Sequence, residues 1–130
     1  MKFKMDILIS MHPEFITQIN LGLKKFEYRK TLPKLSVNTV YIYGTRPLSR
    51  VVAKFEVKRV ISDNLISLWE KTNYNSGITK ERFFQYFGEH NNGYAIEIVN
   101  FRLLPHPLQI EEFCGKKHPP QNFYYLKQGV

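Results

Sequence analysis

The sequence predicts an α+β domain, a small mixed β-barrel of four or five strands with short helices on its flanks. Several segments alternate between apolar and polar residues with a period of two, which is typical of half-buried strands. Shorter segments between them carry apolar residues at helical spacing and are bounded by proline, threonine or glycine. The chain has 130 residues, of which 43% are hydrophobic and 15% aromatic. We therefore expect residues 1–130 to form a single domain with its own core.

Period-two alternation is clearest in "SRVVAKFEVKRVI", where Val51, Ala53 and Phe55 are expected to face inward and Lys54 and Glu56 to face water. "DILIS" is a short apolar run bounded by polar residues, typical of a buried strand. The tail, residues 106–126, is expected to be irregular and to include a short strand. The predicted strands before it cover residues 6–10, 24–30, 38–45, 49–61 and 93–104.

Three helices are predicted between the strands. In residues 12–24, Pro13 suits the first helical position, Glu14 favours the positive end of the helix dipole, and Gly22 ends the helix. In residues 79–88, Thr79 is expected to be the N-cap, and the phenylalanines have the spacing of a core-facing helix. Residues 64–71 have the same kind of apolar spacing.

The formal net charge is +8, and it is unevenly distributed. Residues 1–60 contain twelve Lys or Arg against four Asp or Glu, whereas residues 61–130 contain seven of each kind. This asymmetry favours a basic face that attracts a polyanion, most often a nucleic acid. No apolar run approaches the ~20 residues of a membrane helix. Cys114 is a single cysteine, so we expect no disulfide within the chain and a cytoplasmic location.

The segment "GLKKFEYRK", residues 22–30, raises the main functional question, because one glutamate lies among three lysines and an arginine. Alternation places Glu27 and Arg29 on one strand face, and Lys24 lies at the corner between helix and strand. In one interpretation, Lys24 and Arg29 grip a phosphate or base edge while Glu27 orients them or takes a proton. In the other, the strand is exposed and its ion pairs contribute roughly 0–1 kcal/mol each.

The same segment resembles the ASCH domain family, small barrels related to the RNA-binding PUA fold. The family's opening has a strand, a helix and then a G-x-K-x-x-E-x-R signature, and the residues here match it in order. "VNTVYIYGTRP", "SRVVAKFEVKRVI" and "PPQNFYYL" are similar to later strands of the family, so the resemblance covers nearly the whole chain. The residues that match the signature are Gly22, Lys24, Glu27 and Arg29.

The resemblance implies a barrel with a polar cleft beside the signature and a role in binding RNA. Some bacterial members instead hydrolyse acylated cytidines with a lysine, a threonine three residues later and a distant glutamate. Here the third residue after Lys24 is Glu27, which removes the expected hydroxyl, and Thr31 is too far along to replace it by simple substitution. The resemblance therefore favours binding over this hydrolysis.

Further candidates come from the ends of other predicted strands. Ser10 and His12 follow the first strand and are expected near the cleft. In "YGTRP", Thr45 and Arg46 suit a phosphate, and Tyr43 could stack on a base; an ordinary turn is the alternative. The full set of proposed ligand-binding residues is Lys24, Lys25, Glu27, Arg29, Ser10, His12, Tyr43, Thr45, Arg46 and Tyr124.

Three functional hypotheses follow. The first is a domain that binds RNA or a nucleotide, with single-stranded DNA left open, and without metal or cofactor, since no zinc-type ligand spacing is present. The second is a metal-independent hydrolase of modified, acylated nucleosides or of RNA, with Lys24 and Glu27 as catalytic residues. The third is a regulatory module that recognises a protein or a small anionic metabolite.

Overall fold

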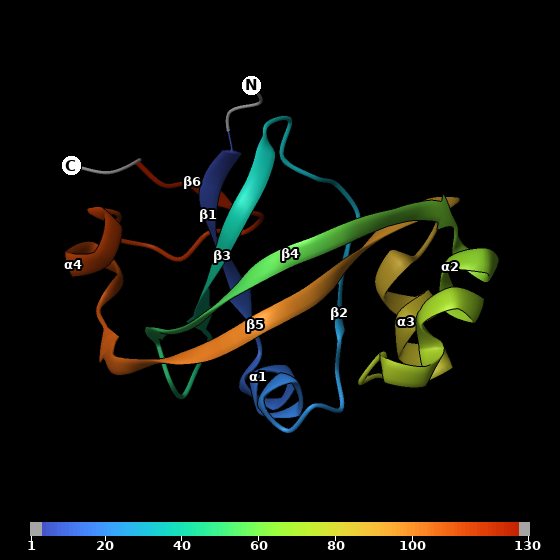
Figure 1. The fold of residues 1–130 in the computed structure, drawn as a ribbon, viewed down its shortest axis with the longest axis horizontal. Helices are drawn as coiled ribbons and strands as arrows, with labels where there is room; N and C mark the ends of the chain where they lie inside the picture. The colour runs from blue at the N-terminus through green and yellow to red at the C-terminus, as the bar shows by residue number, and fades with distance from the viewer. Residues whose placement is uncertain (1–3, 128–130) are drawn as a thin grey trace.

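The computed structural model describes residues 4–127 as a curved six-stranded sheet with short helices (Figure 1). One helix precedes the third strand, two helices and a 3-10 turn lie between the fourth and fifth strands, and a further helix follows the fifth. The elements are β1 (Lys4–Met11), α1 (Pro13–Asn20), β2 (Phe26–Arg29), β3 (Ser36–Gly44), β4 (Arg50–Asn64), α2 (Leu65–Thr72), η1 (Asn73–Asn75), α3 (Lys80–Phe87), β5 (Asn92–Leu108), α4 (Ile110–Cys114) and β6 (Tyr124–Tyr125).

The strand order is β2-β5-β4-β3-β1-β6, with β1 and β3 parallel and the other neighbours antiparallel. The predicted α+β class is therefore confirmed. The predicted barrel is not, because in the described part of the chain the edge strands β2 and β6 pair only with β5 and β1 and leave the sheet unclosed. The open side lies between these two edges.

All five predicted strands and all three predicted helices occur, with modest shifts of their ends. β4 continues to Asn64 and β5 to Leu108, so these two strands form a long ribbon that crosses the whole molecule (Figure 1). The predicted short strand in the tail is β6. The five-residue helix α4 was not predicted, because its N-cap, Gln109, makes no side-chain capping bond and proline residues surround it.

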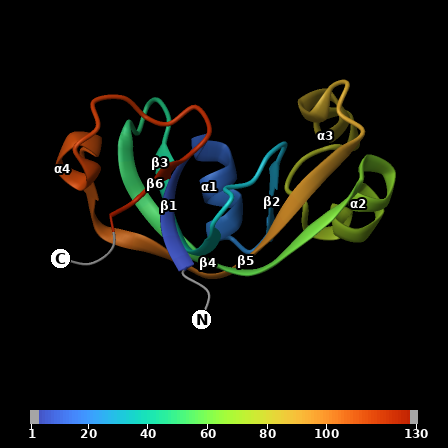
Figure 2. The ribbon, with the colours of Figure 1, turned by 90° about the horizontal axis from the view of Figure 1, so that it is seen from above.

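The main core fills the concave side of the sheet. Figure 2 shows α1 inside this curve, where Ile16 and Ile19 pack against inward-facing residues of β1, β3, β4 and β5. Within β4, Ala53 and Phe55 are fully buried and belong to this core, as the alternation predicted. The core fixes α1 beside β2, and the chain between them must turn sharply.

Helices α2 and α3 form a lobe at the far end of the β4–β5 ribbon (Figure 2). Asn64 caps α2 by accepting from Ser67 N at 2.9 Å, and Thr79 caps α3 as predicted, accepting from Arg82 N at 3.1 Å. Phe83 and Phe87 of α3 are fully buried against Tyr28 of β2. This packing sets α3 opposite α1 across the end of β2. No helix of the described residues is long and apolar enough to cross a membrane.

Candidate functional site

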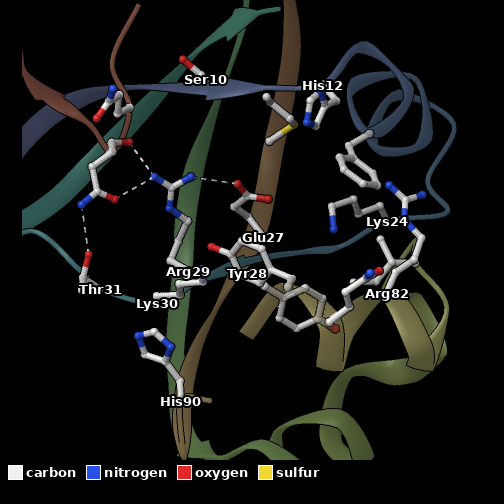
Figure 3. A pocket seen from close by; sticks show the side chains of 17 residues that line it. Ser10, His12, Lys24, Glu27, Tyr28, Arg29, Lys30, Thr31, Arg82 and His90 are labelled. Carbon is white, nitrogen blue, oxygen red and sulfur yellow. Dashed lines mark hydrogen bonds and ion pairs between the residues drawn. The ribbon is translucent and has the colours of Figure 1, made fainter. Parts of the chain in front are cut away.

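A cleft of about 710 Å³ opens between the end of β1, helix α1, strand β2, helix α3 and the segment before β6 (Figure 3). Five separate stretches of sequence therefore contribute side chains to it. The lining residues are Ser10, Met11, His12, Phe15, Lys24, Glu27, Tyr28, Arg29, Lys30, Thr31, Ile78, Arg82, Gln85, Tyr86, His90, Gln121 and Asn122.

Lys24 is a buried cation in the wall of this cleft, only 3% exposed. Its ammonium donates to the backbone oxygen of Ser76 at 2.9 Å and lies 5.1 Å from the ring centres of both Phe15 and Tyr28. Burial lowers the pKa of Lys24 below its usual value, and the charge of Glu27 partly opposes this effect. The lysine is therefore held by dipoles and aromatic faces, and its charged form is poorly solvated.

Local backbone geometry explains how Lys24 reaches this position. Helix α1 ends at Asn20, and Gly22 follows with φ +80°, a left-handed conformation that glycine adopts readily. The backbone N–H of Lys24 then bonds to Gln18 O at 3.3 Å as the chain turns into β2. Gly77 packs so closely that a Cβ there would lie 2.8 Å from the Cβ of Lys24. The sequence prediction of a turn that directs Lys24 into a cleft agrees with this geometry.

Glu27 and Arg29 form an ion pair inside the cleft, with Arg29 Nη1 at 3.4 Å from Glu27 Oε2. Glu27 is only 8% exposed, so the face of β2 that carries these charges looks into the cleft and not into bulk water. Arg29 Nη2 also donates to the backbone oxygen of Asn122 at 2.5 Å. Asn122 Nδ2 in turn donates to Thr31 Oγ1 at 3.3 Å (Figure 3). Side chains thus bridge the two open edges of the sheet.

Helix α3 contributes the opposite wall. Arg82 Nη2 forms an ion pair with Glu14 Oε1 at 3.0 Å, and its guanidinium lies 5.2 Å from the centre of the Phe15 ring. Tyr86, further along the same helix face, contacts the ammonium of Lys30 at 4.9 Å from its ring centre. Burial raises the pKa of the Tyr86 hydroxyl, while the charge of Arg29 acts in the opposite direction. Arg82 and Tyr86 of α3 are therefore each in contact with a group from across the cleft, the ring of Phe15 and the ammonium of Lys30.

Five of the ten predicted ligand-binding residues line the cleft. Ser10 Oγ donates to the backbone oxygen of Pro120 at 2.7 Å, so its hydroxyl proton is already engaged. His12 lies at the mouth of the cleft, where its Nδ1 is 3.4 Å from Thr45 Oγ1. The five are Ser10, His12, Lys24, Glu27 and Arg29.

The other five lie outside the lining. Lys25 and Arg46 are exposed and are not among the lining residues, and Thr45 contacts His12 at the mouth of the cleft. Tyr43 is buried in a separate core cluster with Leu8, Val51 and Ile110, which leaves no free ring face for a base. The hydroxyl of Tyr124 donates to His118 O at 2.8 Å, and its ring packs on that cluster.

Several lining residues were missed by sequence reasoning. Arg82, Gln85 and Tyr86 lie three and four residues apart, a spacing that places them on one helix face opposite the buried phenylalanines. That amphipathic pattern could have identified them. Asn122 and Gln121 had no comparable signal, because only the tertiary fold brings the proline-rich tail to β2. Thr31 also lines the cleft, on the opposite side from Lys24 in Figure 3.

No group of three or more His, Cys, Asp or Glu side chains is placed to hold a metal ion anywhere in residues 4–127. The polar groups of the cleft are two lysines, two arginines, a carboxylate, two histidines, two tyrosines, a serine, a threonine and three amides. Such a set suits an anionic ligand with hydrogen-bonding edges.

The structure is thus a small α+β domain, with an open curved sheet, α1 on its concave side and a polar cleft at its unclosed edge. The family model described as the ASCH domain matches residues 9–104. The chain therefore belongs to the ASCH domain family, as the signature residues predicted.

Relatives and solved structures agree with this assignment. The chain is 24% identical over 126 residues to a protein named ASCH domain-containing ribonuclease from Zymomonas mobilis, covering 95% of this chain and 85% of that protein. The crystal structure of ASCH from Zymomonas mobilis superimposes with a TM-score of 0.86 at 22% identity, covering 95% of this chain and 88% of the other. A variant of that protein gives a TM-score of 0.87 at 21% identity, with coverages of 96% and 92%. Structural likeness at this identity shows the shared fold.

Two relatives from Ureaplasma parvum are longer proteins. One is named ATP synthase subunit alpha, 26% identical over 125 residues, and the match covers 95% of this chain but 16% of that protein. The other is named large ribosomal subunit protein uL22, 28% identical over 122 residues, with coverages of 93% and 39%. The chain thus spans only a minor part of these two relatives.

Proposed function

We propose that this ASCH domain binds RNA and holds a nucleotide segment of it in the cleft beside Lys24. The observation that carries the proposal is the buried ammonium of Lys24. None of the ion pairs found among residues 4–127 includes it, and the backbone oxygen of Ser76 accepts its hydrogen bond. A buried charge without an ionic partner costs free energy, which an anionic ligand in the cleft would offset.

The size and lining of the cleft support a nucleotide. A volume of about 710 Å³ lies within the range of pockets that enclose small molecules. Arg29 and Lys30 offer cationic donors, and Glu27 offers acceptor oxygens for the N–H groups of a base. Tyr86 offers a ring face, and stacking on such a ring contributes about 1–3 kcal/mol per base.

Two further facts favour RNA over a small anion. The excess positive charge of the chain falls entirely in residues 1–60, which include β1, β2 and most of the cleft's cations. The relative from Zymomonas mobilis, of which the match covers 85%, is named a ribonuclease. A long-range positive field attracts a polyanion more strongly than it attracts a single phosphate.

The test compares Lys24→Met with Lys25→Met in binding to a fluorescent single-stranded RNA pool and a matched DNA pool at two salt concentrations. Methionine fills nearly the same volume as lysine, and removing a buried charge leaves the fold intact or more stable. Lys25 is the matched control, because it is adjacent and exposed but lies outside the cleft lining. Both variants lower the net charge equally.

We expect Lys24→Met to weaken RNA binding by tenfold or more, about 1.4 kcal/mol, and Lys25→Met to weaken it only slightly. Equal effects of the two variants would show that binding depends on general charge and not on the cleft. Absence of binding to both pools by the wild-type protein would exclude the proposal. Tighter binding of DNA than of RNA would identify single-stranded DNA as the partner.

Cleavage of RNA is a second candidate, favoured by the lowered pKa of Lys24 beside Glu27. A lysine whose pKa is lowered loses its proton more readily and can then act as a base. Lys24 would accept the proton of a ribose 2′-hydroxyl, and the 2′-oxygen would attack the adjacent phosphorus. The bond to the 5′-oxygen would break, with Glu27 relaying the proton to it, leaving a 2′,3′-cyclic phosphate and a 5′-hydroxyl.

The assay for this candidate is the release of cyclic-phosphate ends from the RNA pool. Wild type and Lys25→Met should produce them, Lys24→Met should not, and a pool with 2′-deoxyribose throughout should be inert. Binding without any product would leave the domain as a binding module. Incubation with acylated cytidines tests hydrolysis of a modified nucleoside in the same series.

A further inference from the structure

Arg82 and Lys24 lie together at the α1–α3 end of the cleft, where both contact the ring of Phe15. The ring centre of Phe15 is 5.2 Å from the Arg82 guanidinium carbon and 5.1 Å from Lys24 Nζ. The positive charge of Arg82 also contributes to the lowered pKa of Lys24, because the two cations repel each other electrostatically. Two like charges around one ring form a favourable position for a ligand anion.

Glu14 occupies the outer side of this position. Its Oε1 lies 3.0 Å from Arg82 Nη2, and that hydrogen bond is the main cause of the lowered pKa of the Glu14 carboxyl. Both side chains are about half exposed, at 49% for Arg82 and 52% for Glu14. An exposed pair of this kind contributes little to stability, whereas a phosphate can bind a guanidinium through two parallel hydrogen bonds.

We propose that Arg82 and Lys24 form a phosphate subsite over Phe15, and that Glu14 occupies Arg82 until a phosphate of the ligand displaces it. The subsite rests on the proposed function, since the phosphate belongs to the bound RNA. Glu14 then acts as an internal competitor that weakens binding. Because Glu14 is on α1 and Arg82 is on α3, the same pair also connects the two walls of the cleft when it is empty.

The competitor role predicts an increase in affinity when Glu14 loses its charge. Glu14→Gln keeps the shape of the side chain and removes the negative charge. The matched control is Glu112→Gln on α4, an exposed carboxylate outside the cleft lining, which changes the net charge by the same amount. Arg82→Gln removes the phosphate ligand, and the double variant Glu14→Gln/Arg82→Gln completes a mutant cycle.

The measurement is the affinity for a random-sequence fluorescent RNA hexamer pool at several salt concentrations, with thermal unfolding to verify each fold. We expect Glu14→Gln to tighten binding about threefold to tenfold and Glu112→Gln to change it far less. The gain should disappear in the Arg82→Gln background. Arg82→Gln should also reduce the slope of log affinity against log salt by about 0.7, the value for one phosphate contact on a single strand.

Equal affinities of Glu14→Gln and Glu112→Gln would overturn the competitor role, and an unchanged salt slope in Arg82→Gln would overturn the subsite. In either case the wild type would still bind RNA, so the proposed function would stand. Failure of both wild type and Glu14→Gln to bind would overturn the proposed function and this inference together. Binding by Glu14→Gln alone would support both.

Discussion

Arg29 donates to the backbone oxygen of Asn122 at 2.5 Å, although the two residues lie 93 positions apart in the sequence. The same guanidinium is paired with Glu27 at 3.4 Å. One side chain therefore fixes a buried carboxylate and also ties the tail to β2 across the open side of the sheet. Because β2 and β6 are not paired in the described chain, this contact is one of the few connections between the two edges.

Replacement of Arg29 should loosen the tail as well as destabilise the domain. In Arg29→Met, Glu27 loses its ionic partner and Asn122 O loses its donor, and we expect the free energy of unfolding to fall by about 2 kcal/mol. Arg29→Lys should lose less stability than Arg29→Met, because an ammonium can pair with Glu27 but cannot reach both Glu27 and Asn122 O. Urea denaturation measures the loss, and faster amide exchange in residues 121–125 of the methionine variant reports the freed tail. Wild-type exchange there would contradict the bridge.

Because Gly77 packs closely on Lys24, replacing Gly77 by alanine should destabilise the protein more than replacing Gly22 does. Both have positive φ, +72° and +80°, so alanine costs about 1–2 kcal/mol at either position. At Gly77 the new Cβ also meets Lys24 Cβ at 2.8 Å, whereas at Gly22 nothing lies within 4 Å. We expect Gly77→Ala to cost a further ~1–3 kcal/mol and to weaken RNA binding, since it moves Lys24. Equal stabilities of the two variants in urea would refute the contact.

The lowered pKa of Lys24 makes stability depend on pH in a definite direction. Burial disfavours the charged form in the folded state, so between the lowered folded pKa and 10.5 the unfolded chain binds more protons. Stability should therefore rise with pH in this window. Below the folded pKa, the full free-energy cost of burying the charged ammonium destabilises the folded state. Lys24→Met lacks the group. As the pH rises toward 10.5, the stability of wild type should increase relative to that of Lys24→Met in urea titrations run side by side; an unchanging difference between the two proteins would contradict the assignment.

Tyr28 should produce the opposite trend at higher pH. Burial raises its pKa to about 12, from a usual value of 10.0. Between these values the folded state keeps a proton that the unfolded chain loses, so stability should fall as pH rises. Tyr28→Phe should lack this decline relative to wild type. Near pH 7 the free energy of unfolding of Tyr28→Phe should be only about 1 kcal/mol below that of wild type. The variant lacks the 2.7 Å hydrogen bond between the Tyr28 hydroxyl and Thr72 Oγ1, but Thr72 still donates to Leu68 O. Denaturant unfolding at several pH values measures both effects.

The fold was predictable wherever local pattern decides structure. Alternation in residues 49–61 identified β4 and its buried face, and Pro13 and Thr79 marked the starts of α1 and α3. Closure of the barrel was not predictable, because it depends on how far β2 and β6 approach each other after the whole chain has folded. The two edges are connected by side-chain hydrogen bonds, but β2 and β6 do not pair through their backbones.

The site divides in the same way. Lys24, Glu27 and Arg29 share one short segment, so their spacing alone indicated a common cleft. Lys25 shares that segment but lies just before β2, where its backbone bonds to Asn75 and Ile98 and its side chain points outward. For Arg82 the polar face of α3 was the one local signal, and nothing local reveals that this face lies opposite α1. The same limit applied to the tail residues, which only the fold places beside β2.

Asn64 and Asn92 form the last paired rung of the β4–β5 ribbon, and every residue of α2, η1 and α3 lies between them. The entry and exit of this segment are therefore fixed side by side by the ladder, whatever the segment contains. It supplies Arg82, Gln85, Tyr86 and His90 to the cleft, while β2 and the turn before it supply Lys24, Glu27 and Arg29. The ladder sets where this wall leaves and rejoins the sheet, whereas Lys24, which donates to Ser76 O, and Tyr28, which packs against α3, fix how the wall lies on β2. A change inside the segment would therefore reach the cleft through these two side chains, while the strand register at its base is set by the ladder.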